Sequence, residues 1–459
     1  MSRSFDAAII GAGQAGPSLA GRLTAVGMTV ALIERKLFGG TCVNTGCTPT
    51  KTLVASAYAA HLARCAHDYG VGITGPVTVD MKAVKARKER VLLQSRNGLE
   101  AWLKGMERCT VFEGHAHFLG PRELGVGEER ITAERVFINV GGRALVPDMP
   151  GVGSVPVLTN SSLLELDIVP RHLVVVGGSY VGLEFAQIFR RFGAQVSVVE
   201  KGSRLIARED EDVSSAVREI LEGEGIAVRT DATCISFKPQ GADIAVGVDC
   251  SSGAPEIVGS HVLLAVGRRP NTDDLGLDKA GIETDERGFI RVDDTLATNV
   301  PGVFAIGDCN GKGAFTHTSY NDFEIVAANL LDHEPRRVSD RVTAYALYTD
   351  PPLGRAGLSE SEARRKGHKI RVGMRPMTRV GRAVEKGETK GFMKIIVDAE
   401  SEAILGASIL GVGGDEAVHC VLDMIYAKAP YRTLQHAVHI HPTVSELIPT
   451  LLSELGPAS

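Results

Sequence analysis

The sequence predicts an α/β fold that combines two Rossmann-like, dinucleotide-binding domains with a C-terminal α+β domain. Residues 5–35 have the pattern of an apolar strand, a glycine turn, a helix, a second strand and a closing acid. Residues 172–201 repeat that order, and in both units 23 positions separate the first glycine from the acid. No nucleotide-binding motif follows after about residue 341, which indicates a different kind of domain there.

The composition is that of a multidomain globular protein. The 459 residues are 44% hydrophobic and 23% charged, and the net charge of −5 gives no basic surface for nucleic acid. No apolar run reaches the ~18 residues that a membrane span needs. The first strand leads directly into a glycine turn, unlike a secretory signal. We therefore expect a cytoplasmic protein that binds neither nucleic acid nor membranes.

The first unit carries the complete GxGxxG pattern. Gly11, Gly13 and Gly16 follow a strand and open a helix, so backbone N–H groups and the positive end of the helix can bind a pyrophosphate. Glu34 ends the second strand, where its carboxylate can accept hydrogen bonds from a ribose. A glycine pattern alone also occurs in turns that bind nothing, but this context indicates a dinucleotide site.

The second unit has Ser179 at the middle glycine position, between Gly177 and Gly182. The alternative to a second nucleotide site is a relic that binds nothing, but the spacing and the closing acid, Glu200, are intact. Two such units predict two bound dinucleotides. Electron transfer between a flavin and a nicotinamide is the obvious reason to bring them together.

The charge at the end of the second unit predicts which nicotinamide is bound. Glu200 can accept from an adenosine ribose hydroxyl and would repel a 2′-phosphate, which favours NAD(H). Lys201 and Arg204 lie close by and could bind a phosphate if Glu200 turned away, so NADP(H) stays the alternative.

The eight cysteines show no framework spacing for a chain of this length, so structural disulfides are not expected. Six of them are interpreted as small buried hydrophobic residues: Cys65, Cys109, Cys234, Cys250, Cys309 and Cys420. Cys42 and Cys47 differ, because only four residues separate them within the glycine- and threonine-rich stretch GGTCVNTGCTPTK (39–51). This pair needs its own explanation.

Cys47 is expected to lie at the positive end of a helix, because Thr48 and Pro49 have the pattern of an N-cap and first helical residue. The helix dipole favours a thiolate by about 0.3–1 kcal/mol. Lowering a thiol pKa from ~8.5 to below 7 needs roughly 2–3 kcal/mol, so a second stabilising partner is required. A flavin ring stacked on Cys47 would be such a partner.

The alternative chemistry for two neighbouring cysteines is a metal site. It would need nearby histidines or a second cysteine pair. His61 and His67 are six positions apart and do not share one helix face, so no metal site is predicted. A redox-active disulfide is the favoured interpretation.

Four features together resemble the class I pyridine nucleotide-disulfide oxidoreductases, the FAD family of dihydrolipoyl dehydrogenase, glutathione reductase and mercuric reductase. They are the two dinucleotide units, GGTCVNTGCTPTK, AIGDC (305–309) and HPTVSE (441–446). The resemblance spans nearly the whole chain, and residues 380–399 look most like the mercuric reductase branch. It implies that the first unit binds FAD, that the second binds NAD(P), and that a C-terminal dimerisation domain forms a homodimer.

The resemblance also implies roles for single residues. Cys42 matches the interchange thiol that attacks the substrate disulfide, and Cys47 matches the charge-transfer thiol beside the flavin. Lys51 matches the lysine near the flavin N5 and Glu184 its acidic partner, while Tyr180 matches the aromatic residue over the nicotinamide pocket. The further expected cofactor contacts are Glu34 on the FAD ribose, Asp308 on the ribityl chain, Thr41 and Gly267.

The C-terminal stretch supplies the expected acid/base pair. Glu446 lies five positions after His441, and a carboxylate can orient an imidazole and raise its basicity. His436 and His439 also permit a metal or plain surface interpretation. The resemblance favours the acid/base pair and implies that it completes the active site of the partner subunit.

The sequence departs from mercuric reductases near its end. The stretch LLSELGPAS contains no cysteine pair that could pass a soft metal ion inward, which argues against mercury as the natural substrate. The predicted function is therefore an FAD-dependent NAD(P)H:disulfide or dithiol oxidoreductase of the dihydrolipoyl dehydrogenase type. The alternatives are a mercuric reductase-like metal-ion or quinone reductase, and a sensing subunit without turnover.

The domain boundaries follow from the positions of the motifs. We expect an FAD domain over residues 1–150, resumed over 271–340, an NAD(P) domain over 151–270 and a dimerisation domain over 341–459. The substrate is expected to be a small-molecule or protein-bound disulfide or dithiol.

Overall fold

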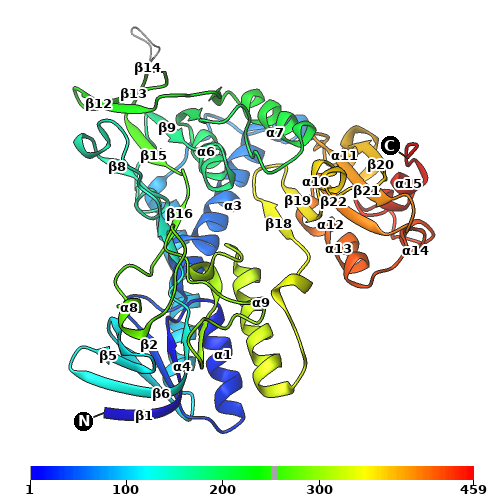
Figure 1. The fold of residues 1–459 in the computed structure, drawn as a ribbon. Coiled ribbons are helices and arrows are strands. Elements are labelled where there is room, and N and C mark those ends of the chain that lie inside the picture. Colours follow the sequence, from blue (N-terminus) through cyan, green and yellow to red (C-terminus); the bar gives the residue numbers. More distant parts are fainter. Residues whose placement is uncertain (1, 250–255, 459) are drawn as a thin grey trace.

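The computed structural model describes residues 2–249 and 256–458. Figure 1 shows two α/β units, one built mainly from the first 140 residues and one from the middle of the chain, and a third sheet lies to one side. Among the described residues, no helix combines the length and hydropathy needed to cross a membrane. The mixed α/β architecture confirms the predicted fold class.

The first sheet has seven strands in the order β3-β2-β1-β6-β5-β4, with β17 beside β6. Its parallel part consists of β1 (Ser2–Ile10), β2 (Val30–Glu34), β3 (Cys109–Glu113), β6 (Glu129–Ile138) and β17 (Val303–Ala305). The antiparallel strands β4 (Ala116–Gly120) and β5 (Glu123–Val126) extend it. The neighbours Ile9 and Ile10 on β1 belong to different apolar clusters, so both faces of the sheet are covered.

The second sheet has five parallel strands in the order β11-β10-β9-β15-β8. Their bounds are β8 (Val157–Leu158), β9 (His172–Val176), β10 (Gln195–Val199), β11 (Ala227–Arg229) and β15 (His261–Leu264). Both predicted βαβ units are present: β1, α1 (Ala15–Ala25) and β2 form the first, and β9, α6 (Tyr180–Phe192) and β10 form the second. The helix α7 (Glu211–Gly223) follows β10.

A two-stranded ribbon lies where the chain passes between the two sheets. β7 (Gly142–Ala144) pairs antiparallel with β16 (Arg268–Pro270), so the outgoing and returning segments run side by side. The α/β unit in the middle of the chain also contains a small antiparallel sheet of β12 (Ser236–Gln240), β13 (Asp243–Gly247) and β14 (Glu256–Gly259). The domain boundaries at 150, 270 and 340 stay predictions.

The C-terminal part is a five-stranded antiparallel sheet in the order β18-β19-β22-β21-β20. Its strands are β18 (Ala344–Leu347), β19 (Leu353–Gly357), β20 (Ile370–Pro376), β21 (Phe392–Asp398) and β22 (Ile404–Leu410). The helices around it include α10 (Glu360–Arg365), α13 (His419–Tyr426), α14 (Tyr431–Gln435) and α15 (Leu447–Ser453). This is the α+β unit that the sequence predicts.

The helix after the cysteine pair begins earlier than predicted. The N-cap of α3 (Cys47–Arg64) is Gly46 and not Thr48, and the Thr50 N–H donates to the Gly46 carbonyl at 3.0 Å. The reason is the close turn from α2 (Gly40–Thr45) into α3: a Cβ atom at Gly46 would lie 2.9 Å from the Thr41 carbonyl oxygen. Cys47 therefore occupies the first turn of α3, at its positive end.

Two expectations about the other cysteines are wrong. Cys234 takes part in a disulfide bond, although none was expected outside the redox pair. Cys309 is buried, but Cys65, Cys109 and Cys420 are only half-buried. Spacing rules describe cysteine frameworks of small secreted domains and give no information on a single bridge in a long chain. Cys250 lies outside the described residues.

Candidate active site

The glycine turns of both units have the geometry that only glycine permits. Gly11 has a φ of +111°, and a Cβ atom on it would lie 2.3 Å from the Asn139 carbonyl oxygen. Gly177 has a φ of +114°, with a Cβ position 2.4 Å from the Ala265 carbonyl oxygen. The third glycines, Gly16 and Gly182, each lie against the carbonyl of the first glycine, at 2.3 and 2.1 Å from their Cβ positions.

The two closing acids are held at these turns by backbone N–H groups. Glu34 accepts hydrogen bonds from Ala12 at 2.9 Å and Lys36 at 2.8 Å. Glu200 accepts from Gly178 at 2.6 Å and Gly202 at 2.7 Å. Each carboxylate is thereby held at the glycine turn of its unit, where the sequence pattern predicts a ribose contact.

The segment with the cysteines lies directly on the first glycine turn. The Gly39 N–H donates to the Ala12 carbonyl at 2.9 Å, and a Cβ atom at Gly40 would lie 2.8 Å from the Cα atom of Gly13. At Gly13 a Cβ atom would contact the Asn139 side chain, 3.4 Å from its Nδ2 atom. The predicted FAD contacts are thus brought together from separate segments.

Three further residues were predicted to contact FAD: Asp308, Thr41 and Gly267. Burial raises the pKa of Asp308, and the guanidinium of Arg268, 3.7 Å away, acts in the opposite direction. The Thr41 hydroxyl donates to the Gly142 carbonyl at 3.3 Å, beside the ribbon that contains Arg268. Gly267 has a φ of +136°, which other residues rarely adopt. The glycine turn, the acid Glu34 held at it and the half-buried carboxyl of Asp308 fit a bound FAD.

Cys42 and Cys47 lie within hydrogen-bonding distance of each other, and no disulfide bond joins them. The hydrogen bond from Cys42 lowers the pKa of Cys47 to about 6, helped by Thr316, whose Oγ1 is 3.3 Å from the Cys47 sulfur, and by the charge of Lys51. The same hydrogen bond, together with burial, raises the pKa of Cys42. The pair therefore consists of a thiolate at Cys47 and a thiol at Cys42.

Lys51 and Glu184 form an ion pair that joins α3 to α6. The Lys51 Nζ is 2.7 Å from Glu184 Oε2, and Glu184 is 5% exposed. The second oxygen of Glu184 accepts from the Tyr348 N–H at 3.0 Å, and the Lys51 Nζ lies 4.5 Å from the centre of the Tyr348 ring. Because Lys51 is four residues after Cys47 on α3, its charge faces the sulfur.

Tyr180 is the first residue of α6 and bonds to an acid that sequence reasoning missed. Its hydroxyl donates to Glu209 Oε1 at 3.0 Å, and the Tyr345 hydroxyl donates to the same oxygen at 2.7 Å. Burial is the largest cause that raises the pKa of Tyr180. Thr316, Tyr345 and Glu209 lie in segments without a motif, so no signal in one sequence marks them.

His441 and Glu446 form the predicted pair just before α15. The His441 Nδ1 is 2.9 Å from Glu446 Oε2, and the side chain of His441 is 78% exposed. Across the described parts of the chain, no hydrogen bond or ion pair connects this pair to either active-site cysteine. The neighbouring apolar residues Val438 and Ile440 are 98% and 80% exposed. In a single chain the His441 ring thus faces outward.

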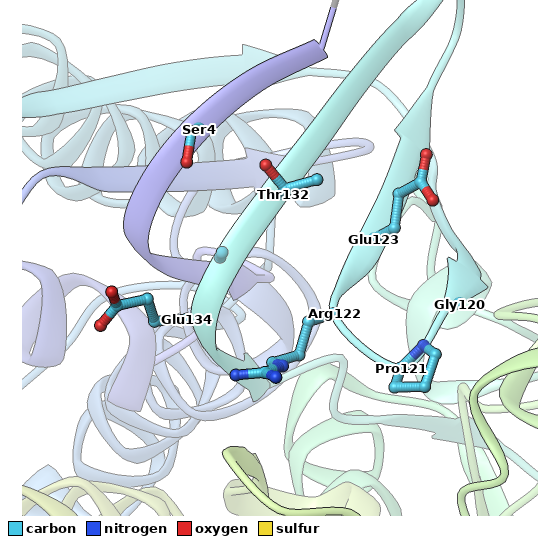
Figure 2. Close-up of a pocket in the computed structure, with 8 residues that line it drawn as sticks. Ser4, Gly120, Pro121, Arg122, Glu123, Thr132 and Glu134 are labelled. Atoms are coloured by element: carbon cyan, nitrogen blue, oxygen red, sulfur yellow. The ribbon is translucent and has the colours of Figure 1, made fainter.

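The metal alternative gains no support, since no cluster of three or more His, Cys, Asp or Glu within residues 2–249 and 256–458 could hold a metal ion. A surface depression near β4–β6, shown in Figure 2, is lined by Arg122, Glu123 and Glu134. It includes Ser4 at the start of β1, whereas the glycine turn follows the end of that strand. None of the predicted site residues lines it.

Comparisons with known proteins agree with this geometry. The family model described as pyridine nucleotide-disulphide oxidoreductase matches residues 5–322, and the dimerisation domain of that family matches residues 343–452. A probable pyridine nucleotide-disulfide oxidoreductase, RclA of Escherichia coli, is 35% identical over 98% of this chain and 99% of its own. The dihydrolipoyl dehydrogenase of Thermus scotoductus is 33% identical, over 97% and 96% of the two chains.

More distant and structural matches extend the comparison. The mercuric reductase of Bacillus cereus is 30% identical over 95% of this chain and 70% of its own. The solved Cu(II) complex of the HOCl-induced flavoprotein disulfide reductase RclA from E. coli has a TM-score of 0.88 at 35% identity, covering 97% of this chain and 99% of that one. The chain therefore belongs to the pyridine nucleotide-disulphide oxidoreductases, FAD-dependent enzymes that use NAD(P)H as electron donor.

Proposed function

We propose that the protein is an FAD-dependent NAD(P)H:disulfide or dithiol oxidoreductase of the dihydrolipoyl dehydrogenase type. The observation that carries the proposal is the pair of neighbouring sulfurs at the start of α3, where the Thr316 hydroxyl lies 3.3 Å from Cys47. In this arrangement the pKa of Cys47 is lowered to about 6 and that of Cys42 is raised. A low-pKa thiolate beside a protonated neighbour is what a dithiol needs when one sulfur faces the cofactor and the other faces the substrate.

The residues around the first glycine turn would hold the FAD: Gly11, Gly13, Gly16, Glu34, Thr41, Asp308 and Gly267. A bound FAD would supply the chemistry that passes an electron pair from NAD(P)H to the disulfide that Cys42 and Cys47 form on oxidation. Cys42 then attacks a substrate disulfide and forms a mixed disulfide, and Cys47 attacks the Cys42 sulfur to release the product thiol. Glu184 holds Lys51 in place, and Lys51 keeps a positive charge near Cys47 during this exchange.

His441 is the proposed acid/base group. Because the pKa of Cys42 is raised, its thiol needs a base before it can attack, and the leaving thiolate needs a proton. Glu446 orients the His441 ring through the contact between its carboxylate and Nδ1. Since the His441 ring faces outward beside exposed Val438 and Ile440, we place the pair at a homodimer interface, where it serves the cysteines of the partner subunit.

The geometry at Glu200 supports NAD(H) as the nicotinamide. Both carboxylate oxygens accept backbone hydrogen bonds, from Gly178 and Gly202, which opposes the rotation that a 2′-phosphate would require. The Arg204 guanidinium is turned toward the Ala207 carbonyl at 3.2 Å. Gly177, Gly182 and Tyr180 belong to the same proposed site.

A second candidate is a metal-ion reductase that uses the same sulfurs. It is favoured by the solved Cu(II) complex of E. coli RclA and by the similarity to a mercuric reductase. Thiolates are ligands for soft metal ions. We propose a cytoplasmic location and a small-molecule or protein-bound disulfide as the physiological oxidant.

One steady-state panel tests these proposals. NADH and NADPH are each combined with lipoamide, glutathione disulfide, Cu²⁺, Hg²⁺ and a quinone as oxidants. The reverse reaction is measured with dihydrolipoamide and NAD⁺. Turnover with a disulfide or dithiol that is lost in both Cys42→Ser and Cys47→Ser supports the first candidate. Turnover with Cu²⁺ or Hg²⁺ alone supports the second, and a protein that purifies without a flavin contradicts both.

A further inference from the structure

We propose that Glu209 is a positioning residue that holds Tyr180 closed over the nicotinamide pocket, so that one buried carboxylate sets how readily this pocket opens. The proposal deepens the function above and rests on it, because Tyr180 is taken to cover the nicotinamide. It assigns a role to an acid outside every motif of the chain.

The central observation is one oxygen atom with two phenol donors. Glu209 is 2% exposed, and its Oε1 accepts from Tyr180 at 3.0 Å and from Tyr345 at 2.7 Å. The two rings meet edge to face, with centroids 5.3 Å apart. A ring that must move to admit nicotinamide is thus tied through its hydroxyl group to a buried acceptor.

Glu209 itself is fixed from two directions. The next residue, Asp210, accepts from the Ser361 N–H at 3.0 Å and from the Lys394 Nζ at 2.9 Å, both in the C-terminal part of the chain. Arg355, also 2% exposed, places its Nε 3.4 Å from Glu209 Oε2 and supplies a counter-charge. The acceptor therefore cannot follow a moving tyrosine without breaking buried ion pairs.

Tyr345 belongs to the fixed side of the arrangement. It lies on β18, and its ring stacks on Phe315 with centroids 5.5 Å apart and an angle of 14° between the planes. Tyr180, by contrast, is half-buried at the first turn of α6. Swinging its ring out breaks one hydrogen bond, one ring contact and its packing against the edge of an apolar cluster. We therefore expect the Tyr180 ring to move and Glu209 and Tyr345 to stay in place.

Because the two tyrosines share one acceptor oxygen, two conservative variants should change the opening of Tyr180 in opposite directions. Tyr180→Phe keeps the ring but removes its bond, so opening becomes easier. Tyr345→Phe leaves the same oxygen to Tyr180 alone, and an acceptor that serves one donor binds it more strongly than one that serves two. Opening then becomes harder.

Calorimetric titration of the oxidised, FAD-loaded enzyme with NAD⁺ and with ADP-ribose measures this effect. ADP-ribose lacks the nicotinamide and does not displace Tyr180. We expect Tyr180→Phe to lower the Kd of NAD⁺ by about three- to tenfold, and Tyr345→Phe to raise it about twofold, with the Kd of ADP-ribose unchanged in both.

Glu209→Gln tests the carboxylate directly. A neutral acceptor holds a phenol less strongly, so the Kd of NAD⁺ should fall as in Tyr180→Phe. In the Tyr180→Phe background the same change should have no further effect, because Glu209 acts through Tyr180. Glu211→Gln, an exposed acid in the first turn of α7, is the matched control and should leave both Kd values unchanged.

The proposal is overturned if the ratio of the two Kd values is the same in Tyr180→Phe as in the unaltered enzyme, or if the effects of Glu209→Gln and Tyr180→Phe add. Glu209→Gln removes one counter-charge of Arg355, and Glu362, 3.8 Å away, is another. If this variant does not fold, the opposite changes in the Kd of NAD⁺ expected for Tyr180→Phe and Tyr345→Phe decide the question. Failure of the proposed function looks different, since neither ligand would then bind to the unaltered enzyme.

Discussion

Cys47 on α3 and Thr316 at the start of α9 (Thr316–Ala327) bring a sulfur and a hydroxyl oxygen within 3.3 Å across 269 positions of sequence. This contact is one of the interactions that stabilise a thiolate at Cys47 in addition to the helix dipole. The dipole supplies too little free energy for a thiolate, and the structure adds hydrogen bonds from Cys42 and Thr316 and the charge of Lys51. Protein groups therefore favour the thiolate before any cofactor is considered.

The pH dependence of the thiolate is the first prediction. In the two-electron-reduced enzyme, the long-wavelength absorbance from a thiolate beside flavin should be present above pH about 6 and fade below it, because Cys47 takes up a proton there. Spectra recorded from pH 4.5 to 9 measure the midpoint. A midpoint near that of a free thiol would contradict the assignment.

Removing the Thr316 hydroxyl should move that midpoint. We expect Thr316→Val to raise the pKa of Cys47 by about one to two units, since a hydrogen bond to a charged group contributes roughly 1.5–3 kcal/mol. Thr48→Val changes a threonine next to Cys47 in sequence and serves as the control. Equal shifts in the two variants would mean that the contact at Thr316 is not responsible.

The two sulfurs should respond differently to substitution. Cys42→Ser should keep a thiolate at Cys47 and show the long-wavelength band without reductant, whereas Cys47→Ser should lose the band in every redox state. Both variants should lose disulfide turnover. Absorbance spectra of the purified proteins are sufficient, and the opposite pattern would reverse the assigned roles.

The ion pair between Lys51 and Glu184 should matter for stability. Lys51→Met leaves a buried carboxylate without its partner and should lower the free energy of unfolding by about 1–3 kcal/mol, a discounted value because Lys51 is partly exposed. The double variant Lys51→Met/Glu184→Gln should recover part of this loss. Denaturant titration measures both, and strictly additive losses would mean that the pair is not coupled.

The acid/base pair can be tested by mixing subunits. His441→Ala should slow disulfide turnover far more than flavin reduction by NADH, which rapid mixing separates. Unfolding and refolding His441→Ala together with Cys42→Ser should restore activity, because mixed dimers then contain one site with both Cys42 and His441 intact. No recovery from a mixture that demonstrably forms mixed dimers would contradict a site shared across the interface.

Motifs made the local structure predictable, and long-range contacts made the rest unpredictable. The glycine turns, the acids Glu34 and Glu200 and the order of elements follow from short-range spacing, and the structure contains them. Thr316 reaches the sulfur from a segment far away in sequence, and Glu209 acts on a tyrosine of another element. No periodicity in one sequence encodes such pairings.

The predicted start of α3 was also wrong, by a small number of residues. Thr48 and Pro49 have the composition of a helix start, but the tight approach of Gly46 to Thr41 moves the boundary before Cys47. The disulfide at Cys234 was also not predicted. Both are outcomes of tertiary geometry, which propensity and spacing describe only in part.

The pairing of β17 with β6 has a consequence for synthesis on the ribosome. Val303 sits beside Val136, so the N-terminal sheet stays one strand short until more than 300 residues have left the exit tunnel. The middle sheet closes with β15, at Leu264, and has all its strands sooner. A nascent chain should thus complete its interior module before its amino-terminal one, and Asp308, which emerges after β17, makes cofactor loading one of the last events of maturation.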